Sequence, residues 1–167
     1  MFMIIHCTHK MAAKLSDVSA EPLSETSPLG SWHALLYTVA RRQYVMFCHD
    51  VSRYILFLPG LVKGDFADLG RLHRELFLAT LAKQGVAEVQ LRKTALALDP
   101  MRYDRATDRS VLGSMNVARF DLSVIVELGE HAIDPVTIAV RLNERPAKAG
   151  KVLIWPYKAM LELVNGF

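Results

Sequence analysis

Three short apolar segments follow one another between residues 32 and 58, and they constrain the fold more than any other feature. They are rich in aromatic and β-branched residues and cover residues 32–39, 43–48 and 53–58. Arg41-Arg42 and the mostly polar residues 49–52 separate them. Apolar segments of this length with such short polar turns are typical of neighbouring antiparallel strands. We therefore predict a β-meander whose last strand ends at Pro59-Gly60.

After the meander, apolar residues at three- and four-residue steps indicate helices over residues 66–84 and 109–128. Asp65 is placed to cap the first of these helices, and Thr107 or Asp108 the second. Asp134-Pro135 predicts a third helix that ends near residue 143, and Pro156 opens a last helix over residues 157–164.

The remaining segments complete the predicted fold class. We expect strands over residues 2–7 and 101–105, a short helix over residues 10–15 and a loop over residues 146–150, whereas residues 87–98 fit either a helix or a strand. Strands concentrated early and helices afterwards indicate an α+β fold, in which helices pack on one face of an antiparallel β-meander sheet.

The length of 167 residues fits one domain, predicted to span residues 1–167. Residues 16–30 contain two prolines, four serines and three acidic residues, which favours a mobile loop. Hydrophobic residues make up 51% of the chain, and the mean hydropathy is +0.19. Such a chain has either a large core or an apolar surface left for a partner.

The basic residues are concentrated near the C-terminus. The whole chain carries a net charge of +3, whereas residues 141–158 carry +4, from five basic residues against Glu144. These are Arg141, Arg145, Lys148, Lys151 and Lys158, and Trp155 and Tyr157 lie among them. Basic and aromatic residues together can bind a nucleic-acid backbone and stack on bases, with Arg41 and Arg42 as further contacts. The alternative is a solvated helix end that the macrodipole favours.

Cysteine usage and hydropathy indicate a cytoplasmic protein. Cys7 and Cys48 lie in apolar, strand-like segments, which is typical of buried thiols in a reducing compartment. We expect no signal peptide and no membrane contact, because the apolar segments are shorter than a membrane span.

Histidines near the cysteines raise the question of a metal site. His6, Cys7, His9, Cys48 and His49 offer enough ligands for zinc if their strands are neighbours. Adjacent strand residues point to opposite faces, however, and no paired Cys or His spacing is present. We therefore predict no metal and no cofactor. An activated Cys7 thiolate is less favoured than a buried thiol, and no Ser–His–Asp set can be assigned.

Two further segments contain candidate pocket residues. The stretch RSVLGSMN over residues 109–116 opens a helix, where free N–H groups can bind an anion, and a glycine within a helix suggests close approach by a ligand. Its candidates are Arg109, Ser110, Gly113 and Asn116; the alternative is tight packing through Gly113. Trp32 and His33 can line a pocket at the start of the meander, or else Trp32 lies in the core and His33 faces solvent.

Four blocks in the same order resemble a family of uncharacterised small bacterial proteins. The blocks are MIIHCT (3–8), LGSWHA (29–34), RSVLGSMN (109–116) and RLNERP (141–146). Some members occur on plasmids and other mobile elements, and no activity is established for them. The chain has His49 where similar sequences tend to have Asn, and Val117 where they tend to have Asp. The resemblance implies kinship of fold and no mechanism.

Three functions remain open from the sequence. The first is a non-enzymatic module that binds nucleic acid or a nucleoprotein complex, as a regulator, an antitoxin-like protein or a defence or counter-defence protein. The second is an enzyme that acts on a phosphate-bearing small molecule at Trp32, His33, Arg109 and Asn116. The third is a protein–protein module or homo-oligomer, which the high fraction of apolar residues suggests.

Overall fold

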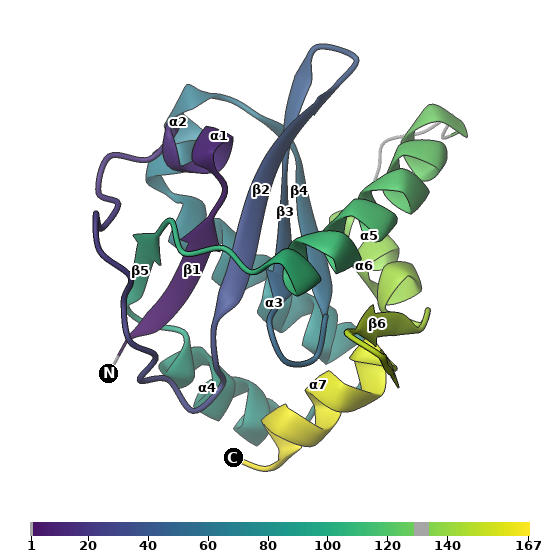
Figure 1. The fold of residues 1–167 in the computed structure, drawn as a ribbon. Helices are drawn as coiled ribbons and strands as arrows, with labels where there is room; N and C mark the ends of the chain where they lie inside the picture. Colours follow the sequence, from purple (N-terminus) through teal and green to yellow (C-terminus); the bar gives the residue numbers. More distant parts are fainter. Residues whose placement is uncertain (1, 129–133) are drawn as a thin grey trace.

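A five-stranded mixed sheet crosses the molecule in the order β4-β3-β2-β1-β5 (Figure 1). The computed structural model describes residues 2–128 and 134–167. The strands are β1 (Met3–Cys7), β2 (Trp32–Val39), β3 (Arg42–His49), β4 (Ile55–Leu61) and β5 (Met101–Asp104). The α+β class is therefore confirmed, and the meander is β2-β3-β4.

The sheet differs from a pure meander at two places. β1 pairs in parallel with both β2 and β5, so only the β2-β3-β4 part is antiparallel. β4 also continues through Pro59-Gly60, because a register shift between Gln43 and Val45 lets Leu61 pair with Gln43. The predicted end of this strand at Pro59-Gly60 is therefore wrong.

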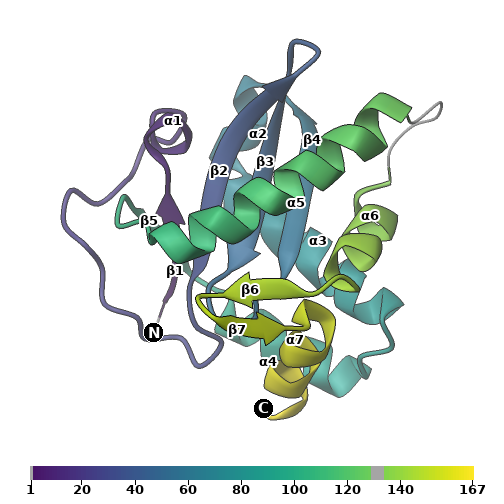
Figure 2. The same ribbon diagram turned by 45° about the vertical axis from the view of Figure 1, so that its right-hand side comes forward.

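Helices cover both faces of the sheet, not one face as predicted. On one face lie α3 (Leu69–Lys83), α4 (Glu88–Ala97) and α7 (Pro156–Asn165). On the other lies α5 (Arg109–Leu128), which crosses the strands in Figure 2, with α6 (Pro135–Asn143) beside β4. The physical reason is the composition of β3, where the alternating residues Met46 and Phe47 are both fully buried. A strand that is apolar on both sides needs two covering layers.

The helix predictions hold with local corrections. Asp108 and Asp134 accept backbone N–H groups at the starts of α5 and α6, as expected for N-caps. The predicted 66–84 helix is two helices, α2 (Lys63–Ala67) and α3, and Asp65 lies inside α2, where it accepts the N–H of Val62 at 2.8 Å. The helix over residues 10–15 is the shorter α1 (His9–Ala12), and residues 87–98 contain α4.

The predicted loop at residues 146–150 is a β-hairpin. Its strands are β6 (Ala147–Ala149) and β7 (Val152–Ile154), and Gly150 adopts a φ of +64° in the turn between them. Strands of three residues give too short an apolar pattern to be recognised from the sequence. In the described parts of the chain, no helix is long and apolar enough to cross a membrane.

Residues 16–30 are irregular but attached to the sheet. Val18 forms an isolated bridge with Tyr103, and the Leu23 N–H donates to the Asp104 carboxylate at 2.9 Å. Ser27 and Leu29 are buried. The mobility of this loop stays a prediction, now limited by these attachments.

Two histidines lie fully buried in the core. His73 packs edge-on against Trp32 and Phe47, and neither of its ring nitrogens has a hydrogen-bond partner among the described residues. Burial lowers the pKa of His73 to about 3. The His49 ring bonds the Leu29 carbonyl and Ser52, and burial lowers its pKa to about 4.

These histidines predict a loss of stability in mild acid. Between pH 6.5 and about 4 these two histidines are protonated in the unfolded chain, whereas their buried rings stay neutral in the folded chain. The free energy of unfolding therefore falls as the pH falls. Replacing His73 by Leu should reduce this slope by about 1.4 kcal/mol per pH unit in that window. Urea denaturation from pH 4.5 to 7 measures the slope. An equal slope in H73L and the wild type would contradict the prediction.

Candidate functional site

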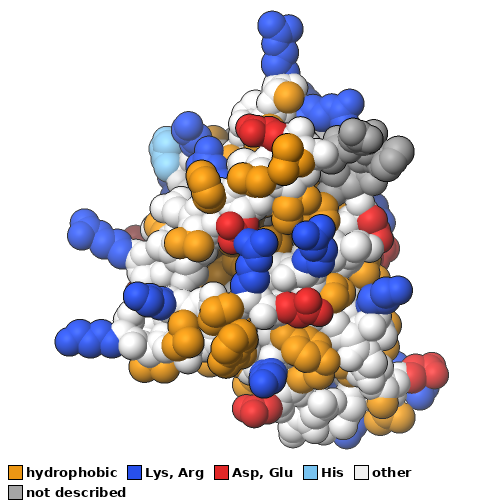
Figure 3. Space-filling model, turned by 90° about the vertical axis from the view of Figure 1, so that its right-hand side faces the viewer, with side chains coloured by type: hydrophobic (Ala, Val, Ile, Leu, Met, Phe, Trp, Pro, Cys, Tyr) orange, Lys and Arg blue, Asp and Glu red, His pale blue; other side chains and the backbone are white. Residues whose placement is uncertain are grey.

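A cavity of about 800 Å³ lies between the first turns of α5, the end of α6 and the β6-β7 hairpin. Its walls are largely apolar, and its charged lining consists of Asp121 and four basic residues: Arg53, Arg109, Arg145 and Lys148. Figure 3 shows hydrophobic and basic side chains side by side on this face of the molecule. Apolar walls with a few placed charges are typical of a ligand pocket.

The cavity brings together two segments that are separate in the sequence. Arg109, Ser110 and Gly113 come from the 109–116 stretch, and Arg145 and Lys148 come from the basic C-terminal segment. The Ser114 hydroxyl donates to the Lys148 carbonyl at 3.0 Å and holds the hairpin against α5. The sequence did not predict this meeting, because the hairpin that carries Lys148 has the sequence pattern of a loop.

Arg53 is the most unusual residue of the cavity. Only 6% of it is exposed, yet it forms no ion pair within residues 2–128 and 134–167. Its guanidinium donates to the Asp50 carbonyl and, at 2.8 Å, to the Ser110 hydroxyl, and its Nε has no partner in this part of the chain. A buried positive charge without a carboxylate is costly, so its natural complement is an anion. The sequence pattern placed Arg53 only at the start of a strand and did not indicate this role.

Backbone geometry also marks this turn. Arg53 has a φ of +61°, a left-handed conformation that few non-glycine residues adopt. Its N–H donates to the His49 carbonyl at 2.9 Å, which closes the β3-β4 turn. The turn thereby holds Arg53 at the wall of the cavity.

Gly113 faces open space. Beyond the backbone of its own helix, a Cβ atom added there would meet no described atom within 4 Å. The tight-packing alternative therefore has no support at Gly113, and the missing side chain leaves room in the cavity instead.

The start of α5 is not a free anion site. The Asp108 carboxylate accepts the N–H groups of Ser110 and Val111, at 2.8 and 3.2 Å. The Val111 N–H, then that of Ser110, lower the pKa of Asp108. The positive charge of the cavity therefore comes from side chains and not from the helix terminus.

The other predicted pocket residues lie elsewhere. Trp32 is fully buried on the opposite face of the sheet, against His73 and Phe77, so it is a core residue and does not line the cavity. Asn116 lines a separate hollow with Thr8 and Arg119.

His33 does not face solvent either, because it is buried below the start of α5. The Asp108 N–H donates to His33 Nε2 at 2.8 Å, so the ring proton lies on Nδ1, which bonds Asp50 at 2.7 Å. Both ring nitrogens are therefore engaged, and His33 serves to hold Asp50.

A second polar cluster lies beside His33 on the same face of the sheet. His6 Nδ1 bonds the fully buried Asp104 at 2.6 Å, and His6 Nε2 lies 3.8 Å from the Asp50 carboxylate. The His6 and His33 ring centroids are 5.0 Å apart. An imidazole held through one nitrogen by a carboxylate can transfer protons through its other nitrogen. Here 15% of the His6 side chain is exposed.

The sequence suggested His6 only as a metal ligand, and no local signal pointed to Asp104. The two residues are neighbours because β1 pairs in parallel with β5, in a register that places His6 opposite Asp104. Nothing in the sequence predicted this pairing of strands almost a hundred residues apart.

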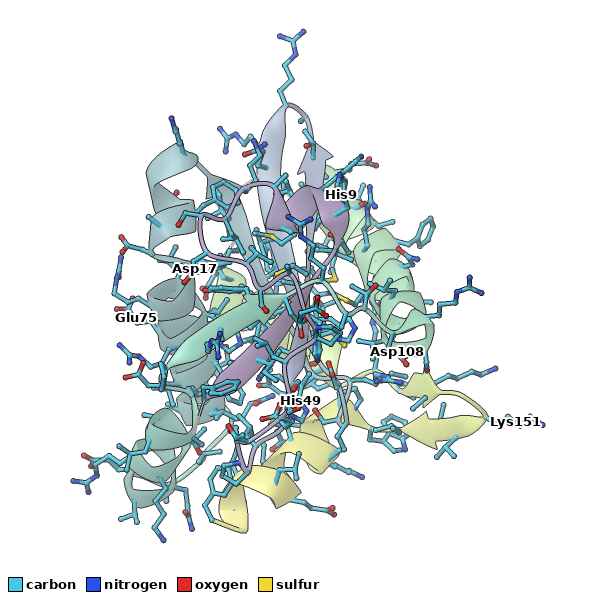
Figure 4. All side chains as sticks on the ribbon, turned by 60° about the vertical axis from the view of Figure 1, so that its left-hand side comes forward. His9, Asp17, His49, Glu75, Asp108 and Lys151 are labelled. Atoms are coloured by element: carbon cyan, nitrogen blue, oxygen red, sulfur yellow. The ribbon has the colours of Figure 1, made fainter. Side chains whose placement is uncertain are left out.

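The basic residues proposed to bind nucleic acid do not form one surface. Arg41 and Arg42 lie at the β2-β3 turn, at the end of the molecule away from the β6-β7 hairpin (Figure 1). Arg145 pairs with Asp121 at 2.5 Å, which compensates part of the C-terminal charge. Lys151 extends from the hairpin turn in Figure 4.

Two further basic side chains of this segment lie apart from the cavity. The Lys158 ammonium lies 5.8 Å above the Trp155 ring, and Arg141 is exposed on α6.

The cysteines are free, buried and on opposite faces of the sheet. Burial raises the pKa of Cys7 to about 12 and also raises the pKa of Cys48. This burial favours an inert thiol over an activated Cys7 thiolate. No group of three His, Cys, Asp or Glu residues in the described segments is arranged to hold a metal ion.

Fold and site together define an α+β protein with a cationic, apolar-walled cavity at the start of a long helix. The family described as a domain of unknown function, DUF6933, matches residues 4–159, and the chain belongs to this family. The resemblance to a family of uncharacterised proteins is thereby confirmed, whereas the bacterial and mobile-element association stays a prediction. A comparison with the curated proteins finds no match.

The Asp104 cluster generates a prediction about stability and the 16–30 loop. The Asp104 carboxylate accepts from His6, the Leu23 N–H and the Ala106 N–H. Asn offers only one acceptor oxygen, so D104N should lower the free energy of unfolding by about 1–3 kcal/mol. It should also release the loop to limited proteolysis.

The matched control is D17N, because the exposed Asp17 carboxylate forms no ion pair in the described chain. Equal loop cleavage in the two variants would show that Asp104 does not anchor the loop.

Proposed function

We propose that the protein is a non-enzymatic binding module whose cavity takes the phosphate of a nucleotide unit, either free or within a nucleic acid. The observation that carries this proposal is Arg53, a buried guanidinium without a carboxylate partner among the described residues. A bound phosphate would supply the missing negative charge and accept charge-assisted hydrogen bonds from it.

The shape and lining of the cavity favour a ligand with an apolar body. A volume of about 800 Å³ suits a nucleotide-sized molecule. The side chains of Val117, Leu142 and Leu153 offer contacts for a flat base, while Arg109 and Lys148 lie at the same cavity for the phosphate. This division of polar and apolar groups is the usual one in nucleotide-sized pockets.

A nucleic-acid strand is the second source of the same chemistry. Lys151 lies in the turn of the hairpin that borders the cavity, and Trp155, 47% exposed, follows that hairpin. These residues could continue the contacts along a single strand. Arg41 and Arg42 lie at the distant β2-β3 turn and make no contact with a ligand in this cavity.

Thermal-shift and calorimetric titrations with nucleotides, and with short single-stranded DNA and RNA, test the proposal. We expect a nucleotide unit to stabilise the wild type, and R53Q to weaken its binding roughly ten- to a hundredfold, as for loss of a charged hydrogen bond. R109A tests the same cavity without changing the β3-β4 turn, and R41A is the control that should bind as the wild type does.

The outcomes separate the two sources of phosphate. Binding of free nucleotides as tight as that of strands indicates a small-molecule ligand, whereas binding of strands alone indicates nucleic acid. Failure of every nucleotide and strand to stabilise the wild type would reject the proposal.

A second candidate function is acid–base catalysis at His6, which the 2.6 Å contact with buried Asp104 favours. If a substrate binds beside His6 rather than in the cavity, H6N should lower its turnover at least about a hundredfold, as for loss of a general acid or base, and leave phosphate binding at the cavity unchanged. Binding should persist, because His6 does not line the cavity. Absence of turnover in the wild type, or equal turnover in H6N, would exclude this function.

A further inference from the structure

A stripe of exposed apolar residues follows the outer side of α5. It consists of Val117, Phe120, Val124 and Leu128, which are 67%, 71%, 41% and 77% exposed. Their steps of three and four residues place them on one side of the helix. A stripe of this kind on a twenty-residue helix is unusual for an isolated surface, because apolar helix faces are normally covered.

We propose that a second copy of this chain packs antiparallel on this stripe, with α5 against α5. A two-fold axis requires a surface that complements itself, and an axis between residues 120 and 121, at the centre of the segment from Gly113 to Leu128, exchanges the apolar positions 117 and 124. Antiparallel pairing places Val117 of one copy opposite Val124 of the other.

The end of the stripe supports the same arrangement. The pairing places Gly113 of one copy opposite the large Leu128 of the other. Gly113 faces open space, and a methyl group added to it would meet no described atom within 4 Å beyond the backbone of α5, so the leucine of the second copy finds room there. A small residue opposite a large one is what close helix packing requires.

Charge complementarity favours antiparallel over parallel pairing. Arg109 and Glu127 are exposed and eighteen residues apart, which is five full turns, so they lie on the same side of α5. Antiparallel pairing brings the Arg109 end of one helix alongside the Glu127 end of the other. The two helix dipoles then also oppose each other, whereas parallel pairing aligns like charges.

The neighbouring hairpin extends the proposed interface. Val152 and Leu153 are 63% and 55% exposed, and β6 of this hairpin contacts α5. A stable interface needs roughly 800 Å² from each partner, which exceeds what a single helix stripe offers. The hairpin residues supply further apolar area next to the stripe. Val117 also lines the cavity, so a second copy would border the ligand site.

Sedimentation across the micromolar range tests the proposal. We expect a dimer for the wild type and a monomer for F120D, because a buried carboxylate at the centre of the stripe is unfavourable. L96D is the matched control, since Leu96 is a comparably exposed leucine on α4, 74% exposed. A wild type that stays monomeric, or an F120D variant that stays dimeric, overturns the proposal.

Disulfide cross-linking tests the orientation of the helices. Phe120 lies near the proposed axis, so F120C should cross-link to itself in the second copy. The two copies of residue 113 would lie about 22 Å apart along the helices, so G113C alone should not cross-link, whereas the double variant G113C/L128C should. The native cysteines are buried and do not compete. Efficient cross-linking of G113C alone overturns the antiparallel arrangement.

Discussion

Burial of the central strands on both faces is the constraint to which the rest of the structure responds. In β3, Val45 and Phe47 face one layer, and Met46 and Cys48 face the other, all fully buried. Helix α3 covers the first layer, and the long α5 must cover the second. The start of α5 is thereby brought over His33 and beside the β3-β4 turn, where the cavity and the His6 cluster both form.

Asp50 contacts residues of both sites, the cavity and the His6 cluster. Its carboxylate holds His33 and faces His6, while its carbonyl accepts from Arg53 at the wall of the cavity. The surroundings differ in charge: carboxylates of Asp50 and Asp104 flank His6, whereas basic side chains outnumber the single carboxylate at the cavity. An anion is therefore attracted to the cavity side of Asp50 and repelled from the His6 side, which is why binding and acid–base chemistry are proposed for different places.

Much of the local structure could be predicted from the sequence, because its signals are local. The close apolar segments identified the meander, and Asp108, Asp134-Pro135 and Pro156 identified helix starts. The same reasoning placed Arg109, Ser110 and Gly113 in a candidate pocket, and the structure places all three at one cavity. It failed for the hairpin at residues 147–154 and for the two-sided covering of the sheet, because short strands and layer order depend on tertiary contacts.

The roles of the residues on which the site depends most could not be predicted from local sequence patterns. Arg53 matters through burial without a counter-charge, a property that no spacing reveals. His6 and Asp104 are neighbours because β1 pairs with β5. Trp32 does not line the predicted pocket, because side chains alternate along β2 and Trp32 therefore lies on the opposite face of the sheet from His33. The high apolar fraction indicated either a large core or an apolar surface, and the structure contains both. Helices cover both faces of the sheet, and α5 also exposes a stripe of apolar residues.

The position of the two cysteines has a practical meaning for how the molecule opens. Cys7 lies in the layer beneath α3, and Cys48 lies in the layer beneath α5. Each thiol becomes reactive only when its own layer separates from the sheet. The chain therefore contains one natural chemical reporter for each half of its core, and the order in which they react with a thiol reagent reveals which half loosens first.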